Sequence, residues 1–313
     1  MSLCEAKTPE GEPIPIAGDA PYPCENLHSV AGLSFRLPCG DPRLEPIHFG
    51  GSASSPPLDN LVGMVAAWGI ENDWLDFLDP NAPNHHESML ERDLYLQHWK
   101  DFLPTQGRVL DLGGGIGRFT RWLVGQGLEV ELVDPDLRSL WRAVQHASGT
   151  PGRLDVHWST GEHLPEIAPV DVAIAAEVLC YTEDPRRILN NIAKALVPGG
   201  LLLLSVEARW GWASSLDVAP DTLDALMSDG IVHVPGDRWI KTYEKPELES
   251  LLSDWEILSL LPTHYVSSGP FEAAAGDMNL QKVLAWEQDL RGLEQTRHLN
   301  RAWTAVARAP WSG

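Results

Sequence analysis

Apolar residues recur along positions 86–313 with two alternating periods. Short apolar runs, such as 109–112, are typical of strands buried on both faces, whereas apolar residues spaced by three and four, as over 87–103, predict helices. Strands are predicted at 109–112, 128–133, 154–158 and 201–206, with a further one inside 171–180, and helices at 87–103, after 119, after 137 and at 185–196. This alternation predicts an α/β fold with a mostly parallel, doubly wound sheet and helices on both faces.

The last hundred residues continue this core with a less regular pattern. Helices are predicted at 216–229, 246–252 and 279–299, and strands at 255–261 and 302–308. Glu207, Trp210 and Trp212 directly follow the strand at 201–206, at the carboxyl edge where open α/β sheets bind their ligands. We therefore expect the substrate region among these C-terminal insertions.

Residues 1–85 are expected to form an N-terminal extension to a domain at 86–313. The stretch 1–20 has no apolar pattern to bury and is predicted to be a flexible tail. Short apolar runs between turn residues over 22–49 predict one or two strands. The helical spacing over 58–79 predicts either a lid over the ligand pocket or a helix packed on the core.

A glycine-rich turn follows the first strand of the core. Asp111 precedes Gly113, Gly115 and Gly117, and these glycines let the backbone turn sharply before a helix begins. The dinucleotide fingerprint G-x-G-x-x-G is absent, because its third glycine would fall on Arg118 or Thr120, and no phosphate-binding G-x-x-x-x-G-K-[ST] loop is present. The pattern is Asp-x-Gly-x-Gly-x-Gly, which disfavours a nucleotide-dependent oxidoreductase.

This pattern resembles the first motif of the class I S-adenosylmethionine-dependent methyltransferases. Three later stretches, 160–165, 171–180 and 197–203, resemble further motifs of the same family in the expected order. The resemblance covers about residues 88–207. It implies a Rossmann-like, mostly parallel sheet of seven strands whose final strand pairs antiparallel, and it implies S-adenosyl-L-methionine as cofactor.

The resemblance also assigns cofactor-binding roles. Asp111 would help hold the ammonium group, and Asp134, at the end of the second strand, would accept hydrogen bonds from the ribose hydroxyls, with Asp136 as the rival. Thr160 stands where the family often has aspartate, so backbone groups or Glu162 would contact the adenine instead. The cofactor-binding residues implied in this way are Asp111, Gly113, Gly115, Gly117, Asp134, Thr160, Gly161, Glu162 and Glu177.

Methyl transfer requires alignment of the nucleophile, and only hydroxyl or amide nucleophiles call for a proton acceptor. Tyr181 follows the fourth strand and is the first candidate for a positioning group, since Cys180 and Tyr181 replace the family's frequent Glu-His pair. His233 and His264 are the candidate bases, because the unperturbed pKa of histidine lies near neutrality. Glu207 is a further candidate for the base.

Composition limits the partners. A net charge of −21 disfavours nucleic acid, no apolar run is long enough to span a membrane, and a signal peptide is not apparent, so a cytoplasmic location is expected. Four cysteines make no disulfide framework. The sequence offers Cys24, His28, Cys39 and His48 as metal ligands, but it lacks the C-x-x-C pairing, so no metal is expected.

These features predict methyl transfer from S-adenosylmethionine to a nitrogen or oxygen nucleophile. The acidic surface, the tryptophan-rich C-terminal part and the atypical N-terminus favour a small molecule or a modified peptide of natural product biosynthesis as substrate. A cofactor-binding scaffold without catalysis is the alternative, because the motifs argue for cofactor binding rather than for transfer.

Overall fold

The computed structural model describes residues 26–30, 33–37, 48–49, 76–135, 137–215, 220–233, 239–267, 271 and 279–310. The chain divides into two compact units. The first comprises Met1–Trp74, Pro104–Ile174 and Arg186–Val197, and the second comprises Leu75–Leu103, Ala175–Pro185 and Pro198–Gly313. Strand β7 begins in the first unit and ends in the second.

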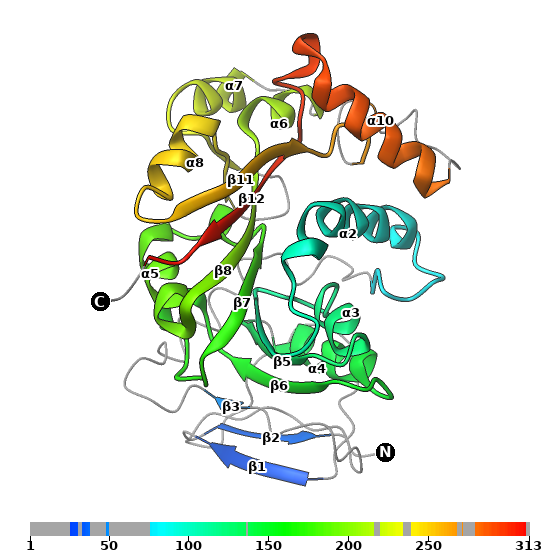
Figure 1. Ribbon diagram of the computed structural model, residues 1–313, viewed down its shortest axis with the longest axis vertical. Helices are drawn as coiled ribbons and strands as arrows, with labels where there is room; N and C mark the ends of the chain where they lie inside the picture. Colours follow the sequence, from blue (N-terminus) through cyan, green and yellow to red (C-terminus); the bar gives the residue numbers. More distant parts are fainter. Residues whose placement is uncertain are drawn as a thin grey trace. The chain divides into compact units, whose positions relative to one another are not determined.

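The first unit contains the parallel part of the sheet (Figure 1). Its strands are β4 (Arg108–Leu112), β5 (Glu129–Asp134), β6 (Arg153–Trp158) and β7 (Val170–Ala176), with β3 (His48–Phe49) beside β6. All neighbours pair parallel in the order β7-β4-β5-β6-β3. Central positions such as Val109, Leu110 and Val133 are fully buried, as a sheet covered on both faces requires.

Helices of the first unit follow its strands, as the sequence pattern predicts. They are α3 (Thr120–Gly125), α4 (Leu137–Ala147), α5 (Pro185–Ala195) and the 3₁₀ turn η2 (Gly161–His163). Pro185 begins α5, where a missing backbone N–H costs nothing, and Ile188, Leu189 and Ile192 are its buried face. The N-terminal pair β1 (Asn26–Val30) and β2 (Leu33–Leu37) is antiparallel.

The second unit contains the antiparallel edge of the sheet. Strand β12 (Ala302–Arg308) pairs antiparallel with both β8 (Leu196–Glu207) and β11 (Glu256–Thr263). The strand order is β11-β12-β8-β7-β4-β5-β6-β3, so the predicted seven-stranded, mostly parallel, Rossmann-like sheet is confirmed, with the two-residue β3 as an eighth strand. The antiparallel final strand is confirmed as well.

Strand β8 is longer than the predicted strand at 201–206. The stretch Pro198–Gly200, whose proline and glycines are typical of a turn, belongs to β8, and Gly199 takes a φ of 76°. The carbonyl of Gly200 accepts a hydrogen bond from the Ala309 N–H at 2.9 Å, so the chain after β12 pairs with this stretch. Partners from the far end of the chain therefore extend the strand where local turn residues predicted a break.

The second unit also contains the helices that precede or follow these strands in the sequence. They are α2 (His85–Trp99), α6 (Arg209–Ser215), α7 (Pro220–Met227), α8 (Lys245–Leu251) and α10 (Leu280–Gly292), with the 3₁₀ turns η1 (Lys100–Phe102), η3 (Leu179–Tyr181) and η4 (Glu294–Thr296) and the antiparallel pair β9 (Ile231–His233) and β10 (Trp239–Lys241). The predicted helix at 216–229 is confirmed over α7, which ends at Met227, and positions 216–219 lie outside the described residues. The predicted helix at 279–299 ends at Gly292, because Leu293 is extended.

Several predictions concern parts of the chain that lie outside the described residues. These are the tail at 1–20, the helical lid over positions 58–75, Asp136, Cys24 and Cys39, together with the side chains of His28, His48 and His233. Positions 76–79 are described and form turns.

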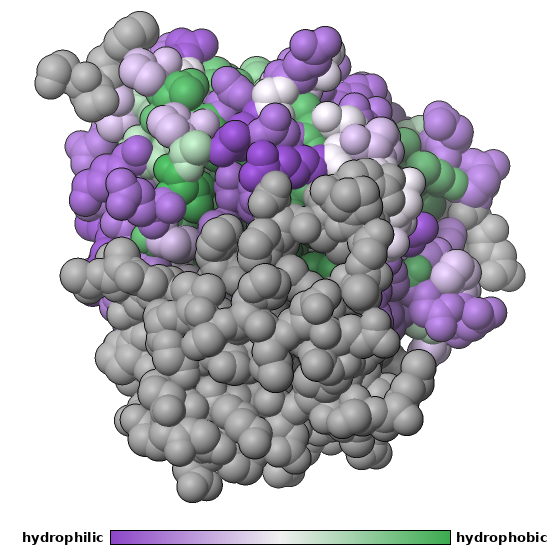
Figure 2. Space-filling view, turned by 90° about the horizontal axis from the view of Figure 1, so that it is seen from below, coloured by the Kyte–Doolittle hydropathy of each residue, from purple (hydrophilic) through white to green (hydrophobic). Residues whose placement is uncertain are grey.

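The surface is consistent with the acidic composition. On the face that Figure 2 shows, the described residues are mostly hydrophilic, with smaller apolar areas between them. Within the described part of the chain, none of the helices combines the length and apolarity that crossing a membrane requires. The described side chains also contain no group of three or more His, Cys, Asp or Glu residues able to hold a metal ion.

Candidate functional site

The glycine turn joins β4 to the end of β5. The Gly113 N–H donates to the Val133 carbonyl at 2.7 Å, and the Gly115 N–H donates to Asp134 Oδ2 at 2.9 Å. Gly113, Gly115 and Gly117 have φ values of 66°, 57° and 93°, the left-handed region that glycine adopts without strain. Two successive strand ends are thereby held together by the loop.

Gly115 is the position of this turn that faces open space. A Cβ atom built on Gly115 would meet no atom within 4 Å, whereas one built on Gly114 would lie 2.5 Å from Leu132 and 2.7 Å from the Asp111 carboxyl carbon. Gly114 is therefore required for packing. At Gly115 the backbone is accessible, so a ligand can approach it closely.

Asp111 lies beneath the turn and is almost fully buried, with 1% exposure. Its Oδ2 accepts a hydrogen bond of 2.6 Å from the Thr120 hydroxyl, at the start of α3. Burial raises the pKa of Asp111 to about 6, although hydrogen bonds from Thr120 and the charge of Arg118 act in the opposite direction. Ionisation of Asp111 therefore lowers the free energy of unfolding.

Asp134 ends β5 as predicted and is 6% exposed. A carboxylate can accept about four hydrogen bonds, so the bond from Gly115 is compatible with further donors from a ligand. Its position at the carboxyl end of a parallel strand next to β4 is the place where this fold class binds the hydroxyls of a ribose.

The loop after β6 is attached to helix α5. Thr160 is 4% exposed, and the carbonyls of Gly161 and Glu162 each accept a hydrogen bond of 3.0 Å from Asn191 Nδ2. Asn191 thus fixes the backbone of the loop in which Thr160, Gly161 and Glu162 are predicted to contact the cofactor. Sequence reasoning missed Asn191, because its partners lie about thirty residues away and no local pattern marks it.

In the second unit, Glu177 follows β7 with a left-handed φ of 59°. Its N–H donates to the carbonyl and to the hydroxyl of Ser205, at 3.0 and 3.1 Å, and its Oε1 accepts a hydrogen bond of 2.7 Å from the Tyr95 hydroxyl. Left-handed backbone at a residue other than glycine is strained and persists only where its surroundings enforce it. The hydrogen bonds to Ser205 and Tyr95 hold Glu177 in this backbone conformation.

Tyr95 is fully buried in α2, and sequence reasoning did not assign it to the site. Its ring stacks on Trp99 at 4.9 Å and contacts the ring of His264 at 4.4 Å. Burial, followed by the charge of Glu177, raises the pKa of Tyr95 well above its usual value. The phenol therefore stays protonated and acts as a donor to Glu177.

Glu207 ends β8 and is bound on several sides. Its N–H donates to the Cys180 sulfur at 3.1 Å, and its carbonyl accepts from the Tyr243 N–H at 2.8 Å. Its Oε2 accepts from Trp212 Nε1 at 2.9 Å and from the Arg301 guanidinium, which lies over the Trp212 ring at 4.1 Å. The end of β8 is thereby bonded to η3, to Tyr243 after β10 and to Arg301 before β12.

Burial is the main reason why the pKa of Glu207 rises to about 7. The negative charges of Glu177 and Glu91 raise it further, and the positive charge of Arg301 lowers it. Glu207 is therefore a carboxyl group that exchanges its proton near neutral pH.

The candidate catalytic residues of the sequence analysis lie in the second unit. Tyr181 is half-buried in η3, which is held by a hydrogen bond of 2.9 Å from the Tyr243 hydroxyl to the Leu179 carbonyl. His264 is 2% exposed with a φ of 62°. The backbone of His233 belongs to β9. The roles assigned to Tyr181, His233 and His264 stay predictions.

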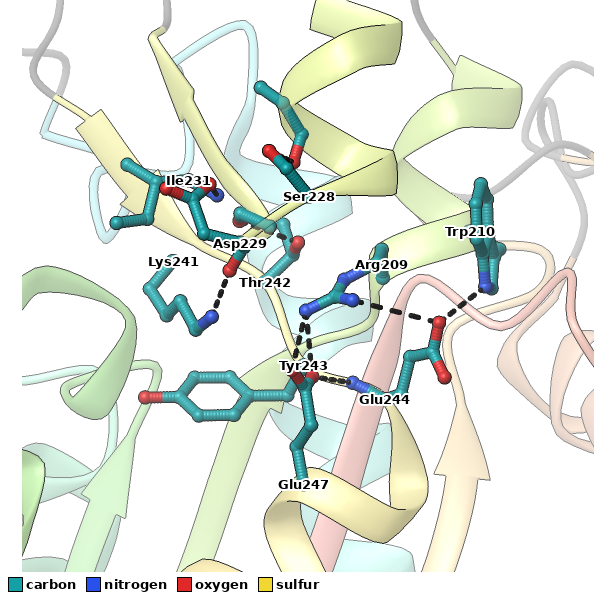
Figure 3. Close-up of polar contacts among 12 residues, drawn as sticks. Arg209, Trp210, Ser228, Asp229, Ile231, Lys241, Thr242, Tyr243, Glu244 and Glu247 are labelled. Carbon is teal, nitrogen blue, oxygen red and sulfur yellow. Dashed lines mark hydrogen bonds and ion pairs between the residues drawn. The ribbon is translucent and has the colours of Figure 1, made fainter.

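Figure 3 shows how the segment after β8 is fastened to α8. Arg209, with 6% exposure, donates from Nη2 to both oxygens of Glu247 at 2.8 and 2.7 Å. Glu244 and Glu247 form a capping box at the start of α8, and Trp210 Nε1 donates to Glu244 Oε1 at 3.1 Å. Trp210, a predicted wall of the substrate pocket, is 37% exposed.

Comparison with known proteins agrees with this geometry. The sequence model of the family described as "Methyltransferase domain" matches residues 74–255, so the chain belongs to this family. It is 31% identical over 109 residues to a ubiquinone biosynthesis O-methyltransferase from Caulobacter sp., covering 34% of this chain and 43% of the relative. It is 36% identical over 121 residues to an uncharacterised methyltransferase from Mycobacterium bovis, covering 36% and 47%.

The chain spans about half the length of the curated relatives it matches. Among solved structures it resembles an S-adenosylmethionine-dependent methyltransferase from Mesorhizobium loti, with a TM-score of 0.52, 21% identity, and coverage of 70% of this chain and 99% of that chain. A second match, a protein from Listeria monocytogenes, has a TM-score of 0.52, 17% identity and coverage of 70% and 98%. These likenesses show the fold.

Proposed function

We propose that this protein transfers a methyl group from S-adenosylmethionine to an oxygen or nitrogen nucleophile of a small molecule. The observation that carries the proposal is the turn after β4, in which an accessible Gly115 backbone is bonded to the carboxylate that ends β5. Membership of the methyltransferase domain family supports the same reaction.

The residues of the first unit fit this cofactor. Its ribose needs an acceptor for two hydroxyls, and Asp134 is a carboxylate at the end of β5. Its methionine part carries an ammonium group, and Asp111 is a buried carboxylate under the turn. It has no pyrophosphate, which agrees with a glycine register that differs from the dinucleotide fingerprint.

S-adenosylmethionine supplies the methyl group as an activated sulfonium electrophile when it is bound. The protein then has to hold the cofactor, orient the nucleophile in line and exclude water. Asp111, Asp134 and the loop held by Asn191 would bind, and Glu177, fixed by Tyr95, would lie beside the methionine part. Tyr181 would position the substrate.

A small molecule is the substrate class that we propose, with natural product biosynthesis as its setting. The strongly acidic composition disfavours nucleic acid, and the ubiquinone biosynthesis O-methyltransferases among the relatives carry names that refer to an oxygen acceptor. We also propose that residues 86–313 are the catalytic domain, that residues 1–85 are an N-terminal extension, and that the protein works in the cytoplasm.

The test is formation of S-adenosylhomocysteine by the full chain, followed by mass spectrometry, with a panel of phenols, catechols and aromatic amines. We expect turnover with at least one class and binding of S-adenosylmethionine by calorimetry. Binding without any turnover would assign the protein to the class of silent scaffolds instead. Binding of NAD without any response to S-adenosylmethionine would contradict the proposal at its first step.

A further inference from the structure

The two carboxylate oxygens of Glu207 have different surroundings. Oε2 accepts hydrogen bonds from Trp212 and Arg301. Oε1 accepts none from the described residues, and the side chain keeps 11% of its surface exposed. One oxygen is thus fixed while the other remains able to accept a proton or a hydrogen bond from a bound molecule.

A comparison with Glu247 in the same unit shows that this asymmetry is not general. Both oxygens of Glu247 accept from Arg209, at 2.8 and 2.7 Å, and its Oε2 also accepts from the Glu244 N–H at 2.8 Å. Glu247 is a structural brace in which both oxygens are used. Glu207 has the same kind of cationic partner but directs only one oxygen to it.

The charged groups around Glu207 favour a carboxyl that exchanges protons near neutrality. Glu177 and Glu91 act against its negative charge, Arg301 supports it, and the buried thiol of Cys180 receives its N–H. The negative charge of Glu207 also contributes to the raised pKa of Tyr95, so this phenol stays protonated. Burial is the main cause that raises the pKa of Glu207 to about 7, a value suited to general base catalysis at neutral pH.

We propose that the substrate presents a hydroxyl group and that Glu207 Oε1 accepts its proton during methyl transfer. Glu207 stands two residues after Ser205, whose carbonyl and hydroxyl hold the backbone of Glu177. Glu177 is the residue assigned to the methionine part of the cofactor. The inference rests on the proposed function and narrows its nucleophile from nitrogen or oxygen to oxygen.

The step balances without another reactant. The hydroxyl oxygen bonds to the methyl carbon while its proton passes to Glu207. The carbon–sulfur bond breaks and its electron pair stays on sulfur, which yields a methyl ether, S-adenosylhomocysteine and a protonated Glu207. Glu207 then releases the proton to solvent. Arg301 and Trp212 keep the carboxyl in place in both protonation states, since both are donors to Oε2.

The experiment uses the full chain and Glu207→Gln, which keeps the shape and an acceptor for Arg301 but cannot take up the proton. Glu207→Asp is the conservative variant, and Glu249→Gln is the matched control, because Glu249 lies in α8 with 47% of its side chain exposed. Each protein is assayed between pH 5.5 and 9 with catechols and with anilines of the same ring. Calorimetry measures the affinity for S-adenosylmethionine, and thermal unfolding checks the fold.

We expect the catechol rate of the wild type to fall as pH drops through about 7, where Glu207 becomes protonated. Glu207→Gln should lose roughly 10²–10⁴-fold in kcat and lose this acid limb, whereas the affinity for S-adenosylmethionine changes little. Glu207→Asp should restore part of the rate together with the limb, and Glu249→Gln should behave like the wild type.

A binding measurement keeps the inference falsifiable if turnover is slow. Catechol is titrated by tryptophan fluorescence in the presence of S-adenosylhomocysteine, and its affinity should fall below pH 7 in the wild type and at all pH values in Glu207→Gln. Absence of catechol binding, equal binding by both proteins, or methylation of anilines alone overturns the inference. Failure to bind S-adenosylmethionine overturns the proposed function instead, so the two failures are distinct.

Discussion

Asp111→Asn should stabilise the protein at neutral pH while it weakens cofactor binding. The buried carboxyl accepts its main hydrogen bond from the Thr120 hydroxyl, and the asparagine carbonyl can accept the same bond. The substitution therefore removes a buried charge and keeps the shape of the site.

The magnitude follows from the pKa of Asp111, which burial raises from 3.8 to about 6. Because the folded-state pKa lies above the unfolded value, the unfolded chain releases this proton first as pH rises. The wild type thus loses stability between pH 4 and pH 6, and the loss is complete above pH 6. Two pKa units correspond to about 3 kcal/mol, and the weaker hydrogen bonds of asparagine cost about 1 kcal/mol, which leaves a net gain of about 2 kcal/mol.

The assay is urea unfolding of the wild type, Asp111→Asn and Glu166→Gln at pH 4, 5, 6, 7 and 8. Glu166 is an exposed carboxylate of the same unit and serves as the control. Asp111→Asn should be no more stable than the wild type at pH 4 and about 2 kcal/mol more stable at pH 7. The reasoning would be refuted if the difference in free energy of unfolding between Asp111→Asn and the wild type did not depend on pH. It would also be refuted if the stability of the variant relative to the wild type were lower at pH 7 than at pH 4.

Three further substitutions test residues of the first and of the second unit. Asp134→Ala should lower the affinity for S-adenosylmethionine by one to two decades, about 1.5–3 kcal/mol, and calorimetry showing unchanged affinity in a folded variant would remove Asp134 from the site. Gly115→Ala places a methyl group in open space at a φ of 57°, so affinity should fall at least tenfold, while backbone strain lowers the free energy of unfolding by about 1–2 kcal/mol; wild-type affinity would mean that no ligand approaches this backbone. Tyr95→Phe removes the donor to Glu177 and should destabilise the fold by about 1–3 kcal/mol in urea unfolding. Equal loss in a Glu177→Gln background would show that the two side chains are not coupled.

The sequence predicted the parts of the site whose chemistry is local. The spacing from Asp111 to Gly117 sets the turn, and Asp134 ends its strand where the apolar run stops. Both depend on residues that are close in the chain, so period and glycine register suffice. The alternation of strands and helices likewise predicted the mostly parallel sheet, whereas its antiparallel last strand was implied by the family resemblance.

The groups that hold the site in place were not predictable in this way. Tyr95 and Glu177 are 82 residues apart, and Arg301 and Glu207 are 94 apart. A helical period over 87–103 shows only that one face is buried. It does not show that the Tyr95 hydroxyl donates to Glu177, because this hydrogen bond depends on how distant segments of the chain pack. The same reason applies to the extension of β8, whose partner lies near the end of the chain.

Hydrogen exchange of the full chain with and without S-adenosylmethionine tests the central claim most directly. The claim is that the cofactor binds against the turn after β4 and the end of β5. We predict slower exchange in peptides that cover residues 111–120 and 129–135, with no such change when NAD is added. Unchanged exchange in both peptides at saturating S-adenosylmethionine, or equal protection by NAD, would contradict the account.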